Sequence, residues 1–305
     1  MKLSRNPAVL TWMAAACLNV FSLTVMSLAD CLPAFAAEPN ANPNANPNAE
    51  LNSDRPVIGI NLDVNADGSE YSLASRYVKA ISKAGGIALV LPPMTTEELG
   101  QVLPKLDGML MIGGDDYPPS SYGQKTESKT CIMAEARSQF DMQIVRSVLA
   151  QPLMPYLGIC AGSQVLNIAS GGELIQDIPT AKPDSKVSHS SKSGWQGKTA
   201  GSHVVTLKEG SKLAAIYAAA KDGGKAVPTA VSFAVPTSHH QCVSTLGKNL
   251  AVAATTDDGV TEAIEGPGSR FVVGVQWHPE RDFEHNSVLF SELIKQAKRY
   301  RASKH

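Results

Sequence analysis

The chain has 305 residues and a formal net charge of −1, from 27 Lys and Arg against 28 Asp and Glu. Its basic residues are scattered and form no positive stripe of the kind that binds a nucleic-acid backbone, so no nucleic-acid partner is expected. Two of the five cysteines lie near the N-terminus. The other three, Cys131, Cys160 and Cys242, are an odd number, which argues against a full disulfide framework and leaves one thiol for another task.

The N-terminal segment has the layout of a secretory signal peptide. Lys2 and Arg5 precede an almost uncharged apolar run, which ends near the small-residue pattern Ala34-Phe35-Ala36. We therefore expect residues 1–36 to be a signal peptide and the protein to be exported, to the periplasm or beyond the cell, touching the membrane only during export. An uncleaved anchor is the alternative, because the run is long enough to cross a bilayer.

A linker follows the signal segment. Residues 37–54 repeat Asn-Pro-Asn-Ala and contain almost no apolar side chain that could be buried, so we predict disorder there. Residues 55–305 have the length of a single α/β domain with one sizeable core.

Strand-like and helix-like patterns alternate along the first half of this domain. They predict a strand at 56–60, a helix at 72–84, a strand at 87–91, a helix at 96–103, a strand at 108–112, a helix at 133–149, a strand at 155–159 and a helix from Ala161. This alternation indicates a mostly parallel sheet covered by helices on both faces.

The second half of the domain changes character. Short strand-like runs separated by turn residues occupy 204–207, 230–235, 250–255, 261–264 and 271–275, and a final helix is predicted at 286–300. We predict a mixed or antiparallel extension of the sheet.

The most informative motif is Gly158-Ile159-Cys160-Ala161-Gly162, where a buried strand turns into a helix. It has the form of a nucleophile elbow with sulfur in place of oxygen. Its two glycines leave room for a strained turn, and the free amides at a helix N-terminus favour an anionic sulfur. A buried structural cysteine is the more common role for a lone cysteine in an apolar run, but the flanking glycines favour a reactive thiolate here.

A base for this nucleophile is offered by His278-Pro279-Glu280, just after a predicted strand. Pro279 biases His278 toward an extended conformation, so the side chains of His278 and Glu280 should point the same way. Glu280 can then hold the imidazole tautomer, as an acidic residue does in hydrolase triads. Taken alone, this three-residue motif indicates only a turn with surface charges. Together with the cysteine elbow it predicts a triad of Cys160, His278 and Glu280.

Acyl transfer also needs amide donors directed at an oxyanion. One is the backbone N–H of Ala161, and the other is expected from Gly113 or Gly114, at the end of a neighbouring strand. An ordinary tight turn at these two glycines is an equally good local interpretation.

Together these motifs resemble the class I glutamine amidotransferases, and more narrowly the γ-glutamyl-γ-aminobutyrate hydrolase branch. The resemblance covers nearly all of residues 55–305 and includes Ala84-Gly85-Gly86, Ile112-Gly113-Gly114-Asp115-Asp116, the cysteine elbow, Ser238-His239-His240-Gln241, Asp257-Asp258-Gly259 and Gln276-Trp277-His278-Pro279-Glu280. It implies a flavodoxin-like three-layer α/β/α domain and a pocket for a glutamyl group, with Gln164, Ser238, His240 and Gln241 near the substrate.

Two further features bear on this resemblance. His239 and His240 could also indicate a metal site or plain packing, but adjacent strand residues face opposite ways and no Cys/His cluster completes a ligand set, so we predict neither metal nor cofactor. The branch usually carries Arg directly after its nucleophile, where this chain has Ala161. An Arg there could help a leaving group or order the site, so this departure bears on the exact substrate.

The resemblance implies hydrolysis of a γ-glutamyl amide through a thioester on Cys160, releasing glutamate and an amine. One alternative is a glutaminase subunit that passes ammonia to a synthetase, although export would separate it from ATP and the chain has no phosphate-binding loop of the Walker type. A noncatalytic exported binding protein is another. A further hypothesis is that Cys131 or Cys242 pairs with, or protects, the nucleophile in an oxidising compartment.

Overall fold

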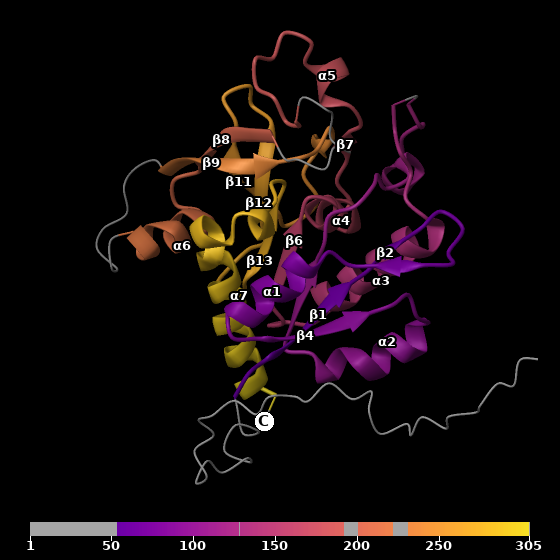
Figure 1. Ribbon diagram of the computed structural model, residues 1–305, viewed down its shortest axis with the longest axis vertical. Helices are drawn as coiled ribbons and strands as arrows, with labels where there is room; N and C mark the ends of the chain where they lie inside the picture. The colour runs from indigo at the N-terminus through magenta and orange to yellow at the C-terminus, as the bar shows by residue number, and fades with distance from the viewer. Residues whose placement is uncertain (1–53, 128, 192–200, 222–230, 305) are drawn as a thin grey trace, which may run out of the picture. The chain divides into compact units, whose positions relative to one another are not determined.

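The computed structural model describes residues 54–127, 129–191, 201–221 and 231–304 (Figure 1). The signal peptide and linker predicted for residues 1–54 lie outside this range, apart from Asp54. Among the described residues, no helix is both long enough and apolar enough to cross a bilayer.

Five parallel strands form the centre of the sheet. In spatial order they are β4 (Ile87–Leu91), β1 (Val57–Asn61), β5 (Gly108–Met111), β6 (Tyr156–Ile159) and β13 (Val272–Val275). By their order along the chain this is the arrangement 2-1-3-4-5 of flavodoxin-like folds. The predicted fold class is confirmed. Parallel strands that all end at one edge bring the residues that follow them together there.

An antiparallel extension continues the sheet beyond β13. It consists of β12 (Thr261–Glu265), β11 (Ala251–Thr255), β8 (Gly201–Leu207) and β9 (Val231–Thr237), and the short strand β10 (Cys242–Val243) joins β12 to β7 (Leu174–Ile175). In Figure 1, β8 and β9 lie at the opposite end of this unit from β4. The predicted mixed extension is therefore present.

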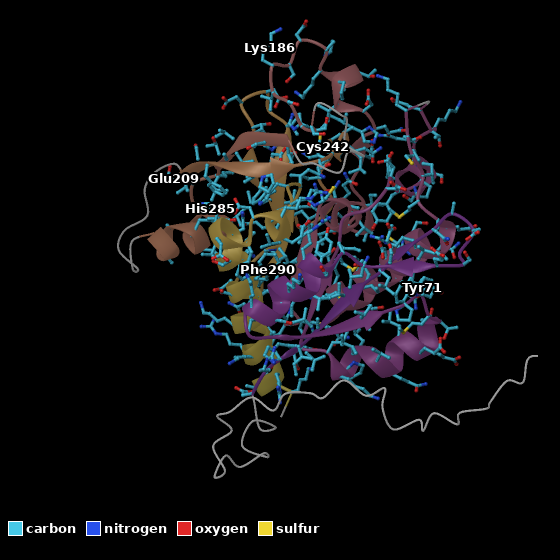
Figure 2. All side chains as sticks on the ribbon, in the orientation of Figure 1. Tyr71, Lys186, Glu209, Cys242, His285 and Phe290 are labelled. Carbon is cyan, nitrogen blue, oxygen red and sulfur yellow. The ribbon has the colours of Figure 1, made fainter. Side chains whose placement is uncertain are left out.

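Helices cover both faces of the sheet, because alternate side chains of the strands enter two separate cores. In β5, Leu110 packs in the core shared with α1 (Ser75–Lys83) and α7 (Phe283–Ala302), where Phe290 is fully buried (Figure 2). Its neighbours Met109 and Met111 enter the second core. That core is covered by α2 (Thr96–Val102), α3 (Glu135–Ala150) and α4 (Ala161–Ala169).

The remaining elements are short or were not predicted. The helix predicted at 72–84 begins at Ser75, because β3 (Tyr71–Ser72) pairs instead with β2 (Asp63–Val64). The helix α6 (Lys212–Lys221) falls in a stretch where no helix was predicted. The others are α5 (Ile178–Ala181) and the 3₁₀ helices η2 (Leu103–Lys105), η3 (Pro119–Tyr122) and η4 (Pro279–Arg281).

Candidate active site

Cys160 occupies a strained turn between β6 and α4. Its φ of 52° and ψ of −108° are unusual for a residue with a side chain. The turn depends on close backbone approaches: a Cβ at Gly158 would lie 2.3 Å from the Gly162 carbonyl oxygen, and one at Gly162 would lie 2.4 Å from that of Met111. Both glycines are therefore needed, and the geometry is that of the predicted nucleophile elbow.

His278 reaches the same sheet edge because β13 runs parallel to β6, with Val275 opposite Ile159. Its imidazole lines the same pocket as Cys160, and its Nδ1 is hydrogen-bonded to Glu280 Oε1 at 2.9 Å. Glu280 also accepts a hydrogen bond from Arg76 Nε at 3.2 Å. The structure thus brings together the three side chains predicted to form a triad, all of them buried.

The opposite charges of His278 and Glu280 stabilise one another. Burial disfavours a charged imidazole, but the Glu280 carboxylate and the Cys160 sulfur outweigh this effect and raise the pKa of His278 from its usual 6.5 to about 9. Burial likewise opposes ionisation of Glu280, but the neighbouring His278 outweighs it and lowers the pKa of Glu280. The arrangement favours an imidazolium held between a carboxylate and a sulfur at neutral pH.

Gly113 and Gly114 follow β5 and border the same pocket as Cys160. A Cβ at Gly113 would lie 3.0 Å from the His278 ring and 3.4 Å from Cys160 Cβ, so a glycine fits this position best. The Gly113 N–H donates to the Tyr77 hydroxyl at 3.2 Å. Of the two predicted donors, Gly114 is therefore the better candidate to act with Ala161.

Arg137 fixes the peptide between these two glycines. Its buried guanidinium donates to the Gly113 carbonyl at 3.2 Å and is itself held by Asp141 at 2.7 Å and Asp63 at 2.9 Å. In a trans peptide the N–H points opposite to the C=O, so the Gly114 N–H is directed away from Arg137.

The predicted substrate residues gather in a narrow recess beside Cys160. Gln164, Ser238, His240 and Gln241 line it together with Gly114, Asp116 and His239. His240 is held from both sides, by Asp116 at 3.1 Å and by Asp177 at 3.3 Å, and the Gln241 amide donates to the Gln176 carbonyl. These contacts fix the wall of the recess.

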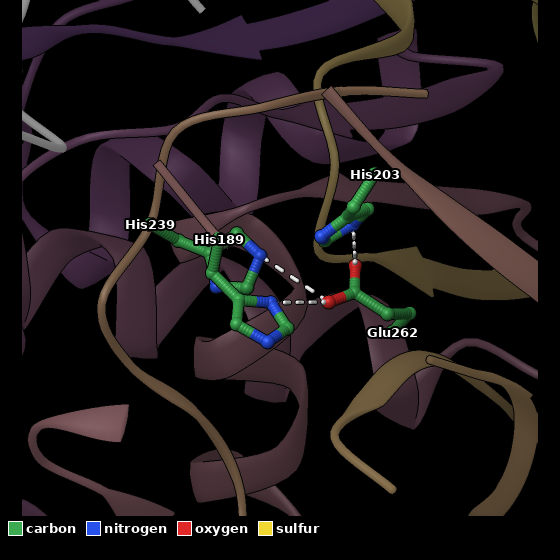
Figure 3. Close-up of side chains that lie close together, drawn as sticks. All are labelled: His189, His203, His239 and Glu262. Atoms are coloured by element: carbon green, nitrogen blue, oxygen red, sulfur yellow. Dashed lines mark ion pairs between the residues drawn. The ribbon is translucent and has the colours of Figure 1, made fainter. Parts of the chain in front are cut away.

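The predicted absence of a ligand set around His239 is wrong. His189, His203, His239 and Glu262 are all buried, and each offers one ligand atom within 4.8 Å of the others (Figure 3). These residues come from separate segments of the chain, and no local spacing marks them. His240 points elsewhere, toward the two aspartates.

Among the described residues, no disulfide joins Cys160 to Cys131 or Cys242. The hypothesised pairing of Cys131 or Cys242 with Cys160 is not seen. Burial is the largest influence on Cys242, and it raises the pKa of this thiol to about 12.

Comparison with known proteins gives the family. A profile of the family described as Peptidase C26 matches residues 56–280. The chain belongs to this family. It is 35% identical over 263 residues to a putative glutamine amidotransferase of Mycobacterium tuberculosis, covering 82% of this chain and 77% of that one. It is 29% identical over 259 residues to the γ-glutamyl-γ-aminobutyrate hydrolase of Escherichia coli K12, covering 82% and 97%.

A solved structure supports the fold alone. A putative GMP synthase component from Thermoplasma acidophilum superposes with a TM-score of 0.52 at 15% identity, covering 82% of this chain and 98% of that one. Together the comparisons confirm that this Peptidase C26 member is a glutamine amidotransferase-like hydrolase of the class I superfamily.

Charged residues for which the sequence predicted no role line the pocket beside Cys160 in this Peptidase C26 hydrolase. The pocket has a volume of about 440 Å³ and holds Asp63, Arg76, Asp115 and Arg281 beside Cys160 and His278. Burial, together with neighbouring Asp63 and Asp116, raises the pKa of Asp115. Asp115 belongs to the motif that begins at Ile112, but no local motif distinguishes Asp63, Arg76 and Arg281 from ordinary surface charges.

Proposed function

We propose that this hydrolase cleaves γ-glutamyl amide bonds through a thioester on Cys160. The observation that carries the proposal is the strained Cys160 elbow, which shares a pocket with a His278 that is hydrogen-bonded to Glu280. Nucleophile, base and orienting carboxylate in this order form the general arrangement for nucleophilic acyl transfer.

Each step of the proposed reaction has a residue. The Cys160 sulfur attacks the γ-carbonyl carbon, and the resulting oxyanion accepts hydrogen bonds from the N–H groups of Ala161 and Gly114. His278 gives its proton to the departing amine as the C–N bond breaks. The neutral imidazole then takes a proton from water, which attacks the thioester and releases glutamate and the free thiol.

The pocket charges suit a glutamyl group. Its α-carboxylate can be met by Arg76 and Arg281, and its α-ammonium group by Asp63 and Asp115, all of which line the pocket with Cys160. The small Ala161 side chain after the nucleophile contributes no charge toward the leaving amine. We therefore propose selectivity for the glutamyl part and tolerance of the amine.

A substrate screen tests this proposal. We expect wild-type protein to release glutamate from γ-glutamyl amines, and amides of glutaric acid, which lack both α-substituents, to react far more slowly. Cys160→Ala should reduce glutamate release by at least about 1,000-fold with an unchanged circular dichroism spectrum. Cys131→Ala is the matched control and should retain activity.

The outcomes separate the alternatives. Turnover that survives in Cys160→Ala would contradict the nucleophile. Turnover of glutamine alone would favour a glutaminase, and binding of γ-glutamyl amides without any turnover would favour a noncatalytic binding protein.

A further inference from the structure

The four residues His189, His203, His239 and Glu262, here called the His₃Glu cluster, lie beside the candidate active site and have no part in the proposed reaction. His203 belongs to β8 and Glu262 to β12, whereas His189 and His239 lie in the loops before β8 and after β9. All four side chains are almost completely buried. Three imidazoles around one buried carboxylate require a physical explanation.

The spacing of the facing atoms resembles that of metal ligands. Glu262 Oε1 lies 3.2 Å from His189 Nδ1 and 3.3 Å from His239 Nε2, and Glu262 Oε2 lies 3.3 Å from His203 Nε2 (Figure 3). Ligands bound at about 2.0–2.1 Å to a tetrahedral zinc lie roughly 3.3 Å from one another. The widest pair, within 4.8 Å, would have to draw closer on binding.

Hydrogen bonds do not account for these contacts. Within the described part of the chain, the facing nitrogens of His189, His203 and His239 and both oxygens of Glu262 are buried without a hydrogen bond of acceptable geometry. Buried polar atoms are rarely left in this state, and the capacity to bind an ion is one recognised reason for it. The short distances with poor hydrogen-bond angles are expected if the lone pairs converge on a shared centre.

Two of the three outward-facing nitrogens are held as they are in metal sites, whereas His203 Nδ1 is buried without a hydrogen-bond partner among the described residues. His189 Nε2 lies 3.1 Å from Asp258 Oδ2, and His239 Nδ1 lies 3.0 Å from the Gln241 carbonyl oxygen. An imidazole that ligates a metal usually donates its other N–H to such a carboxylate or carbonyl, which fixes its tautomer. Asp258 is itself fixed by Ser185 and Thr256, so this support extends beyond the first contact.

We infer that the His₃Glu cluster binds one divalent transition-metal ion of the zinc type, through His189 Nδ1, His203 Nε2, His239 Nε2 and Glu262. Three imidazoles and one carboxylate suit zinc, and four protein ligands leave no open position, which is typical of a structural site. His189 and His239 border a pocket of about 320 Å³, which gives an ion a path from solvent.

The site would connect the antiparallel extension to the candidate active site. It would join strands β8 and β12 to the two loops that carry His189 and His239. His239 lies between Ser238, which lines the pocket beside Cys160, and His240, which lines the recess. A bound ion would therefore stiffen the wall of the pocket without touching the reacting atoms.

The test uses untagged full-length protein stripped with a chelator and then equilibrated with Zn²⁺ or Co²⁺. We expect close to one metal ion per chain by elemental analysis, a visible absorption spectrum of tetrahedral Co²⁺, and a higher melting temperature with either ion. Wild-type protein that binds neither ion and melts unchanged would overturn the proposal, whatever the behaviour of any variant.

Two variants locate the ion. His203→Gln should weaken Co²⁺ binding by more than about 100-fold, since even the loss of an outer partner costs about 10–100-fold. His285→Gln changes an exposed histidine on α7 (Figure 2) and should bind like wild type. If His203→Gln folds and keeps its full metal content, the site is elsewhere and the inference fails. Glutamate release can be followed separately, so failure of the metal site leaves the proposed function standing.

Discussion

At the scale of single residues, the most consequential interaction is the hydrogen bond between His278 Nδ1 and Glu280 Oε1. Since the pKa of His278 is raised to about 9, the stability that its proton brings is fully present below about pH 6.5 and is lost as the pH rises through 9. The same proton is the one that the departing amine would receive.

We therefore expect the alkaline limb of kcat/KM to lie near pH 9. Glu280→Gln removes the negative charge that supports the imidazolium, so its limb should move to lower pH, with a loss of activity of at least about tenfold at pH 8. The measurement is a pH profile of glutamate release. Glu284→Gln, at an exposed position paired with Lys83, should keep the wild-type limb. A limb that stays in place in Glu280→Gln would show that Glu280 does not control this proton.

At the scale of elements, the junction of β6 and α4 shows how backbone packing positions Cys160, the proposed nucleophile. Gly162 lies in the first turn of α4 against the Met111 carbonyl, whereas Gly100 of α2 is surrounded by open space. The same change at the two glycines should therefore have opposite signs.

Gly162→Ala should lower the free energy of unfolding by about 1–3 kcal/mol, because the added methyl group overlaps the backbone of β5. Gly100→Ala should raise it by up to about 1 kcal/mol, since alanine favours a helix interior. Urea denaturation measures both. Equal effects at the two sites would contradict the packing argument.

Elements with a long periodic pattern could be predicted from the sequence, and those without one could not. The parallel strands and the cysteine elbow carry continuous apolar runs with glycines at the turns. The two-residue strands β2, β3, β7 and β10 are too short to show any period. In the site, Cys160, His278, Glu280 and Asp115 belong to local motifs, but Arg76 and the His₃Glu cluster join them only through tertiary folding.

At the scale of the whole domain, α7 connects the layer around α6 to the candidate active site. Asn286 Oδ1 of α7 accepts hydrogen bonds from the Tyr217 hydroxyl at 2.8 Å and from Trp277 Nε1 at 3.2 Å. Trp277 directly precedes His278 and is fully buried. One buried side chain therefore joins α6, α7 and the strand end that carries the proposed base.

Asn286→Ala should destabilise the domain by about 1–3 kcal/mol for each of the two donors it leaves unpaired. Thermal or urea denaturation gives the change. His285→Ala, at the exposed neighbouring position, should stay within about 0.5 kcal/mol of wild type. If the two variants are equally stable, the link through Asn286 contributes little.

The hydrogen bond from Arg137 to the Gly113 carbonyl has a consequence for the whole protein. Because this buried cation already sets the orientation of the Gly114 amide, the proposed oxyanion-binding site would be assembled before any ligand arrives. We therefore expect such a chain to need no second protein to switch it on. Full glutamate release by the purified chain alone would be the expected result.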